Sequence, residues 1–214
     1  MLMIADNLKR VTSRINSVKC SQKVQLIAVS KTRSTAEIQE VVNAGQVHFG
    51  ENYLQESLDK ISFFKESKLI WHFIGPIQSN KTASIAENFD WIHSVDRLKI
   101  AKRLSDQRDP SLEKLNILIQ INIDEEQTKS GLLIKDVNEI ISKVSDLPNI
   151  SLRGFMCIPN PKNSAMSFKK MANLISKYPF LDSLSMGMSS DLELAIKNGA
   201  TFVRVGADIF GPRS

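Results

Sequence analysis

The fold is decided by the stretch Val24-Gln25-Leu26-Ile27-Ala28-Val29-Ser30-Lys31. Its apolar residues 26–29 do not alternate with polar ones, which is typical of a strand buried on both faces. The stretch ends on a charged amine, and an ammonium group is costly to bury without a partner. Lys31 therefore either points into solvent, as most lysines do, or serves as a nucleophile that can form a Schiff base with an aldehyde.

Strand and helix patterns alternate about eight times along the chain. Strands are expected at 24–30, 47–50, 69–74, 90–95, 115–123, 150–158, 181–185 and 201–205. Helices are expected at 3–19, 34–44, 53–66, 79–88, 97–107, 132–145, 164–177 and 191–197. Ser34 and Glu37 form a capping-box pattern at the start of the second helix.

This alternation predicts parallel β/α units. Eight units predict an α/β protein with a single domain over residues 1–214, a (β/α)8 TIM barrel with an extra N-terminal helix. An open doubly wound sheet is the alternative. In either fold, functional residues lie at the carboxyl ends of the strands, where Lys31 falls.

Composition narrows the class of protein. The 214 residues are 42% hydrophobic and 24% charged, and no apolar run is long enough to span a membrane. The start lacks the pattern of a secretory signal, and the two cysteines, Cys20 and Cys157, suit a reducing cytoplasm. The net charge of +5 comes without interleaved aromatic residues, so we expect no nucleic-acid partner and favour small anionic ligands.

Two stretches near the end of the chain suggest an anion site. In residues 185–191, Gly187 permits a tight turn after a strand, and small hydroxyl residues are expected to cap the following helix. In residues 203–207, Arg204 faces away from its valine neighbours and Gly206 exposes its backbone N–H. Loops after strands seven and eight often bind phosphate in barrels. The alternative is an ordinary strand-to-helix turn.

Histidine and sulfur-containing residues leave two further alternatives open. His48, His72 and His93 lie on successive strands and either hold zinc, as in a metal-dependent hydrolase, or pack as hydrogen-bonded core residues, which we favour. A second set is either core or an apolar wall for a flat ring: Met156, Cys157, Met186 and Met188.

Five stretches together closely resemble the YggS/PROSC family of pyridoxal-phosphate-binding homeostasis proteins. They are residues 28–32 (AVSKT), 48–53 (HFGENY), 71–81 (WHFIGPIQSNK), 185–189 (SMGMS) and 203–206 (VRVG). The resemblance covers nearly the whole chain. It implies a barrel like that of alanine racemase, of fold type III among pyridoxal-phosphate proteins, carrying pyridoxal 5′-phosphate on Lys31.

Carried over by position, the resemblance implies the cofactor-binding residues Lys31, Asn52, Met156, Ser189, Arg204 and Gly206. Ser189 and the N–H of Gly206 would hold the phosphate. Arg204 would face the ring nitrogen and, being unable to give up a proton, would keep the ring a weak electron sink. Asn52 and Met156 would line the ring. Lys129 lies where the family has a secondary lysine.

The resemblance also limits the expected function. Alanine-racemase-type enzymes need a second acid–base residue, a tyrosine from an additional domain of a partner subunit. The only tyrosines here are Tyr53 and Tyr178, and neither is expected at a strand end. We therefore expect a carrier in vitamin B6 homeostasis that serves apoenzymes, with no catalytic residue, no metal and no membrane or nucleic-acid partner. The cysteine usage indicates the cytoplasm, and the lack of an exposed apolar helix face in the pattern favours a monomer. A weak amino-acid racemase is the alternative.

Overall fold

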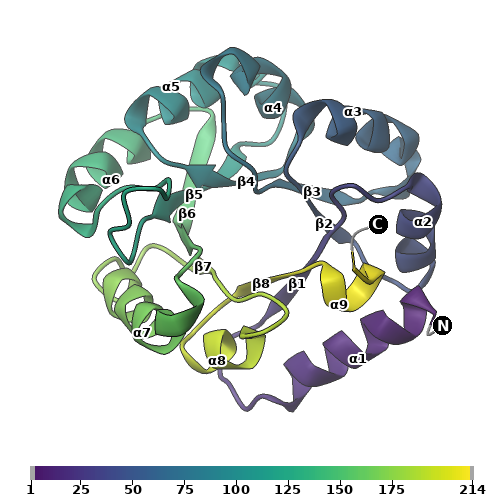
Figure 1. Cartoon of the computed structure of the whole chain (residues 1–214). Helices are drawn as coiled ribbons and strands as arrows, with labels where there is room; N and C mark the ends of the chain where they lie inside the picture. The colour runs from purple at the N-terminus through teal and green to yellow at the C-terminus, as the bar shows by residue number, and fades with distance from the viewer. Residues whose placement is uncertain (1–2, 213–214) are drawn as a thin grey trace.

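The computed structural model describes residues 3–212, and its strands form one closed ring (Figure 1). The strands are parallel and follow chain order: β1 (Gln25–Val29), β2 (His48–Glu51), β3 (Ile70–Phe73), β4 (Trp91–Val95), β5 (Leu115–Ile121), β6 (Ile150–Cys157), β7 (Ser183–Ser185) and β8 (Phe202–Val205). Because β8 pairs with β1, the barrel prediction is confirmed and the open sheet was wrong. Positions 1–2 and 213–214 of the predicted domain lie outside the described residues.

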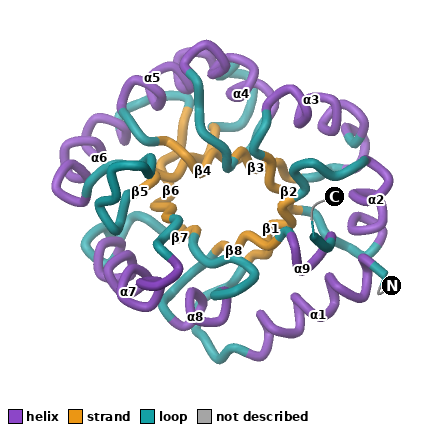
Figure 2. Tube along the Cα trace, viewed as in Figure 1, coloured by secondary structure: helices purple, strands orange, loops and turns teal. Residues whose placement is uncertain are grey.

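Helices surround the ring (Figure 2). They are α1 (Ile4–Ser17), α2 (Thr35–Asn43), α3 (Leu54–Phe63), α4 (Thr82–Asn88), α5 (Leu98–Gln107), α6 (Val137–Ser145), α7 (Ser164–Ile175), α8 (Leu192–Lys197) and α9 (Ala207–Phe210). The predicted capping box opens α2, where the Ser34 N–H donates to the Glu37 carboxylate at 2.8 Å. Within residues 3–212, no helix has the length and apolar character needed to cross a bilayer.

The predicted N-terminal helix fills a gap in the outer layer. Each of the first seven strands is followed by a helix of six or more residues, whereas β8 is followed by α9, which has four. α1 lies beside α9 and between α2 and α8 (Figure 1). Its apolar residues Leu8, Val11 and Ile15 are buried there. The helix that precedes the barrel therefore covers the seam where the barrel closes.

One expected helix begins later than its pattern indicated. Leu132 pairs with Ile121 at the end of β5, and its N–H donates to the Gln120 carbonyl at 2.8 Å. The short 3-10 turn η3 (Ile134–Asp136) then leads into α6. The helical spacing of apolar residues begins at Leu132, but the backbone N–H and carbonyl of Leu132 hydrogen-bond the end of β5 and the residue after it instead of forming a helical turn.

The strands separate an outer core from the barrel interior. On β8, Val203 and Val205 pack in the outer core under the helices, so Arg204 faces inward, as predicted. The register places Arg204 beside Ile27 of β1, which is fully buried. β1 is thus buried on both faces, and it delivers Lys31 to the carboxyl end of the barrel.

Candidate functional site

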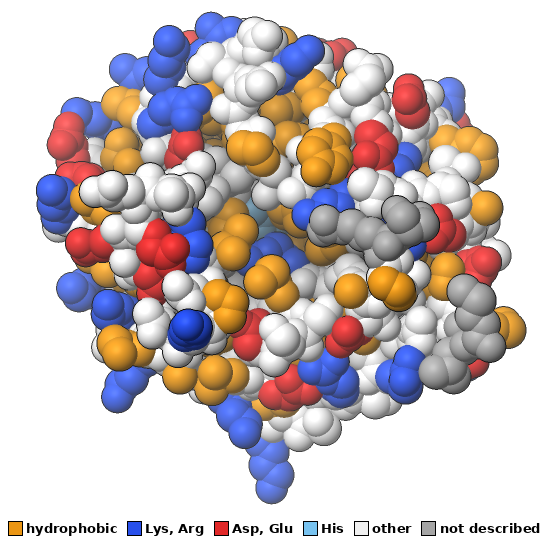
Figure 3. Space-filling model, in the orientation of Figure 1, with side chains coloured by type: hydrophobic (Ala, Val, Ile, Leu, Met, Phe, Trp, Pro, Cys, Tyr) orange, Lys and Arg blue, Asp and Glu red, His pale blue; other side chains and the backbone are white. Residues whose placement is uncertain are grey.

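A cavity of about 300 Å³ opens at the carboxyl ends of the strands. Five of the six predicted binding residues line it: Lys31, Asn52, Ser189, Arg204 and Gly206. Its apolar wall comes from Val29, Ile74, Ile158 and Met188. Basic and hydrophobic side chains gather around the central hollow of this face (Figure 3). A volume of this size is typical of a small-molecule site.

Lys31 lies two residues beyond β1, and both of its neighbours are held by side chains of α3. The Ser30 carbonyl accepts a hydrogen bond from Lys60 Nζ at 2.7 Å, and the Thr32 N–H donates to Glu56 Oε1 at 2.6 Å. Thr32 has a φ of 64°, a left-handed conformation that costs a residue with a Cβ about 1–2 kcal/mol. The contact with Glu56 stabilises this bend, and the bend sets the direction of Lys31.

A buried ion pair lies behind this bend. Lys60 Nζ lies 2.8 Å from Glu51 Oε1, and the Ser30 hydroxyl donates to the same oxygen at 2.6 Å. The Glu51 side chain is 0% exposed and that of Lys60 5%. Burial raises the pKa of the Glu51 carboxyl, and the Lys60 charge acts in the opposite direction. The pair joins β1, β2 and α3 beneath Lys31.

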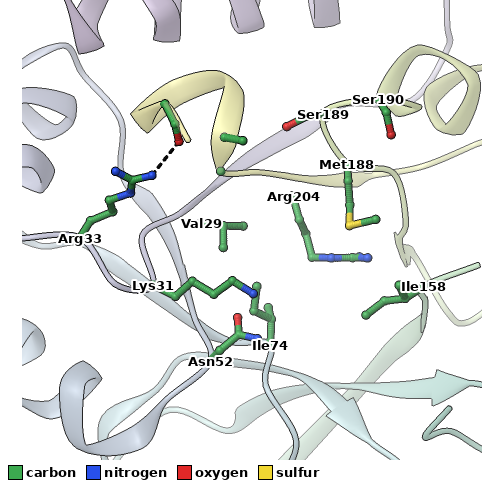
Figure 4. Close-up of a pocket in the computed structure, with 13 residues that line it drawn as sticks. Val29, Lys31, Arg33, Asn52, Ile74, Ile158, Met188, Ser189, Ser190 and Arg204 are labelled. Atoms are coloured by element: carbon green, nitrogen blue, oxygen red, sulfur yellow. Dashed lines mark hydrogen bonds between the residues drawn. The ribbon is translucent and has the colours of Figure 1, made fainter. Parts of the chain in front are cut away.

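Asn52 supplies a polar group with no protein partner. Its Oδ1 atom is buried, and no group within residues 3–212 hydrogen-bonds it. The backbone of Asn52 is packed closely, since a Cβ added at Gly75 would lie 2.2 Å from the Asn52 carbonyl oxygen. Figure 4 shows the Asn52 side chain beside the end of Lys31. A buried amide oxygen left unpaired in this way indicates a place for a ligand.

Arg204 lies among the residues that line the middle of the cavity (Figure 4). Its guanidinium donates to Ser185 Oγ at 2.6 Å and to the Cys157 carbonyl at 3.0 Å. Burial lowers the pKa of Arg204 from its usual value, yet arginine stays charged in proteins. The site therefore presents a fixed positive charge that donates hydrogen bonds and accepts none.

The three histidines form a chain below Arg204. His93 Nδ1 lies 2.9 Å from Ser185 Oγ, His72 Nδ1 lies 2.9 Å from His93 Nε2, and His48 Nδ1 lies 2.9 Å from His72 Nε2. Ser185 Oγ accepts from Arg204, and His93 Nδ1 is its other partner within residues 3–212, so the buried Ser185 proton has an acceptor when it is donated to His93 Nδ1. Every ring downstream then accepts at Nδ1 and donates from Nε2. Pairing the buried Ser185 proton thus favours this one direction for the whole chain.

These contacts favour packed histidines over the zinc alternative. The ring nitrogens bind one another in sequence, and within residues 3–212 no three histidine, cysteine or acidic side chains are arranged to hold a metal ion. Burial lowers the pKa of His72 and His93 well below the usual value, and burial with the nearby Lys23 charge lowers that of His48 to about 4. The chain is therefore neutral at pH 7.

The loop after β7 carries Ser189 into the cavity. Gly187 has a φ of 92°, and a Cβ there would lie 2.5 Å from the Ala195 Cβ, so the turn requires glycine. The expected serine cap was wrong, because α8 begins at Leu192 and the Asp191 carboxylate accepts the Met188 N–H at 2.7 Å. No protein group in the described chain hydrogen-bonds the Ser189 hydroxyl, which leaves it available to a ligand.

Two expected residues lie elsewhere. Met156 is fully buried and does not line the cavity, because its strand places it inside the barrel; Met188 is the one methionine in the wall. Lys129 lines a neighbouring cavity of about 310 Å³ that shares Asn52, Ile74 and Ile158 with the first. There it pairs with Glu126 at 2.9 Å.

Sequence reasoning missed the residues that support the site. Ser185 and Glu51 fall inside quoted stretches, yet no role was assigned to them, and Lys60 lies in the expected helix 53–66 without an assigned role. A charged residue among the apolar positions of α3 was the available signal for Lys60, which is 4% exposed. Ile158 was taken as the last residue of the expected strand 150–158 and was given no role; it follows β6 and lines the cavity.

The fold and the site together define a class: a barrel of the alanine racemase type with a lysine after its first strand. The sequence profile of the family "Alanine racemase, N-terminal domain" matches residues 3–214. Alanine racemase from Corynebacterium glutamicum superposes with a TM-score of 0.70 at 17% identity, covering 97% of this chain and 60% of that one, which is a likeness of fold.

Nearer relatives specify the family. The pyridoxal phosphate homeostasis protein of Escherichia coli (strain K12) is 46% identical over 229 residues, covering 98% of this chain and 97% of that protein. The protein of that name from Pseudomonas aeruginosa is 47% identical over 223 residues, covering 100% and 97%. PipY of Synechococcus elongatus PCC7942, solved with PLP bound, has a TM-score of 0.85 at 36% identity and covers 97% of this chain and 100% of that one. The chain belongs to the pyridoxal phosphate homeostasis protein family.

Proposed function

We propose that this protein binds pyridoxal 5′-phosphate at Lys31 and keeps it available in the cytoplasm, without strong catalysis of its own. The observation that carries the proposal is that an amine, a serine hydroxyl and an arginine line one cavity. Lys31 and Ser189 lie on opposite sides, with Arg204 between them (Figure 4). The named ligand of the homeostasis relatives and of PipY has an aldehyde and a phosphate at two ends of a flat ring.

The residues present fit this group. When bound, the cofactor supplies an aldehyde that forms a Schiff base with an amine and releases one water. Lys31 presents that amine, and Ser189 with the Gly206 backbone would hold the phosphate. Arg204 lines the cavity between them and would face the ring; as a donor that keeps its proton, it would favour an unprotonated ring nitrogen. The unpaired Asn52 amide oxygen lies within the same cavity.

Weak catalysis is proposed because, among residues 3–212, the cavity lining holds no tyrosine, histidine, aspartate or glutamate that could serve as a second acid–base group. No tyrosine in the described chain lines it. Tyr53 is 54% exposed at the start of α3, and Tyr178 hydrogen-bonds Asn138 on α6. Racemisation requires proton transfer on both faces of the substrate carbon. Ile158 at the rim is 41% exposed, so the cavity is open to solvent. An open cavity suits a monomer that takes up the cofactor and delivers it to acceptor apoenzymes.

The test is a titration of purified protein with pyridoxal 5′-phosphate. We expect a visible Schiff-base absorption band and a borohydride-trapped adduct, with mass spectrometry placing the adduct on Lys31. Lys31→Ala should abolish both signals. Lys81→Ala is the matched control, because Lys81 follows β3 at the same end of the barrel but does not line this cavity; it lines a neighbouring one that shares Asn52 with it. An adduct at unchanged stoichiometry in Lys31→Ala refutes the assignment, and robust amino-acid racemisation by the loaded protein refutes the carrier role.

A further inference from the structure

Arg14 of α1 connects the two loops at the anion-binding end of the cavity. Its Nε and Nη2 donate to the two carboxylate oxygens of Glu193, at 2.6 and 3.0 Å, and its Nη1 donates to Asp208 Oδ2 at 2.6 Å. Nη2 also donates to the Ser189 carbonyl at 2.9 Å. One guanidinium thus binds the loop after β7, the helix that follows it and the helix after β8.

These contacts fix the two residues expected to hold phosphate. The carbonyl that Arg14 holds belongs to Ser189, so the contact restrains the peptide that carries the serine hydroxyl. Asp208 lies two residues after Gly206, within α9, and its contact restrains the turn at Gly206. Both Ser189 and Gly206 line the cavity. A side chain from a helix that precedes the barrel therefore contacts both of the segments that carry these residues.

Arg14 does not itself bind the anion. Four of its five N–H groups are used by the loop carbonyl and the two carboxylates, and those carboxylates outnumber its own positive charge. Arg14 lies on the outer side of the loops and does not line the cavity. Its effect on a ligand is carried by the backbone of the two loops.

We propose that Arg14 is a positioning residue for the phosphate end of the cavity, holding the Ser189 and Gly206 loops at the spacing that a phosphate group requires. The proposal rests on the proposed function. It gives the extra N-terminal helix a role besides covering the seam of the barrel. It predicts that loss of Arg14 weakens recognition of the phosphate and leaves recognition of the aldehyde end intact, because Lys31 is held by α3.

The experiment compares two aldehydes that differ only in the phosphate. Dissociation constants for pyridoxal 5′-phosphate and for pyridoxal are measured by absorbance on wild type, Arg14→Gln and Arg14→Lys. Arg10→Gln is the matched control, since Arg10 lies one turn earlier on α1 and contacts Asn7 within the same helix. Misplaced binding groups lose affinity steeply, so we expect Arg14→Gln to weaken pyridoxal 5′-phosphate binding on the order of tenfold and pyridoxal binding by less than about twofold.

Arg14→Lys should show an intermediate loss, because a lysine provides one charge but cannot bridge the three groups. If Arg14→Gln does not fold, Asp208→Asn takes its place, because it keeps the side-chain shape and weakens one contact. Asp208→Asn should show a smaller loss of affinity that is again selective for the phosphorylated aldehyde. Equal loss for the two aldehydes, or no loss for either, overturns the proposal. A wild-type protein that binds neither aldehyde refutes the proposed function instead, so the two failures are distinguishable.

Discussion

Replacing Lys60 with methionine should destabilise the protein through the charge it leaves behind. The Glu51 side chain is 0% exposed, and its Oε2 has no hydrogen-bond partner in the described chain, so Lys60 is the one cation that compensates it. Breaking a buried ion pair at one partner costs about 3–5 kcal/mol. The Ser30 hydroxyl still donates to Glu51 in the variant, so we expect the low end, about 3 kcal/mol at pH 7.

The pH dependence follows from the direction of the Glu51 pKa. Burial raises this pKa in the folded protein, and removing Lys60 removes the main opposing interaction, so the pKa rises further in Lys60→Met. A carboxyl with a raised folded-state pKa binds its proton more tightly when folded. Its charged form therefore destabilises the fold at high pH, and that penalty disappears as the pH falls through the folded-state pKa. The loss caused by Lys60→Met should be smaller at pH 5 than at pH 7.

Urea unfolding followed by circular dichroism measures these free energies, with Glu51→Gln as the second arm of a double-mutant cycle. Lys60→Met/Glu51→Gln should be more stable at pH 7 than Lys60→Met, because the amide has no charge to desolvate. The lost contacts of Lys60 with Ser30 and Glu56 are common to both variants and cancel. A penalty that is the same at pH 5 and pH 7, together with no rescue by Glu51→Gln, would show that the cost comes from packing and that the electrostatic reasoning is wrong.

Two further predictions concern the cavity and the histidine chain. Nitrogen-15 NMR should show His48, His72 and His93 as neutral Nε2–H tautomers at pH 7, because donation to His93 gives the buried Ser185 proton an acceptor; a neutral Nδ1–H form of His93 contradicts this direction. Ser189→Ala should weaken pyridoxal 5′-phosphate retention by about 1–2 kcal/mol, the loss expected for one charge-assisted hydrogen bond, as measured by equilibrium dialysis. Unchanged retention contradicts a phosphate contact at Ser189.

Much of the fold follows from local pattern. The apolar run before Lys31 identified a doubly buried strand, and the alternation of β8 placed Arg204 inward between Val203 and Val205, as the structure confirms. Both inferences use only the period of side chains along one element. The predicted ends of helices were less accurate where contacts with another element determine them. At Leu132 the N–H donates to the carbonyl of Gln120, so the helix does not begin there.

The partners of the inward polar groups could not be predicted in the same way, because they depend on the stagger between strands. Register pairs Gly50 with His72 and His72 with Trp91. His48 and His93 therefore lie two residues below and two residues above the level of His72 on neighbouring strands. This step is what turns three histidines on successive strands into a diagonal chain.

A shift of one residue in either pairing would turn alternate side chains to the opposite face and break the chain. Nothing in the sequence of a single strand records that stagger. Arg14 and Ser189 illustrate the same limit at longer range, since 175 residues separate a contact that closure of the barrel brings to 2.9 Å. Sequence pattern therefore tells which face a charged residue occupies, and the shear of the closed barrel decides which group it meets.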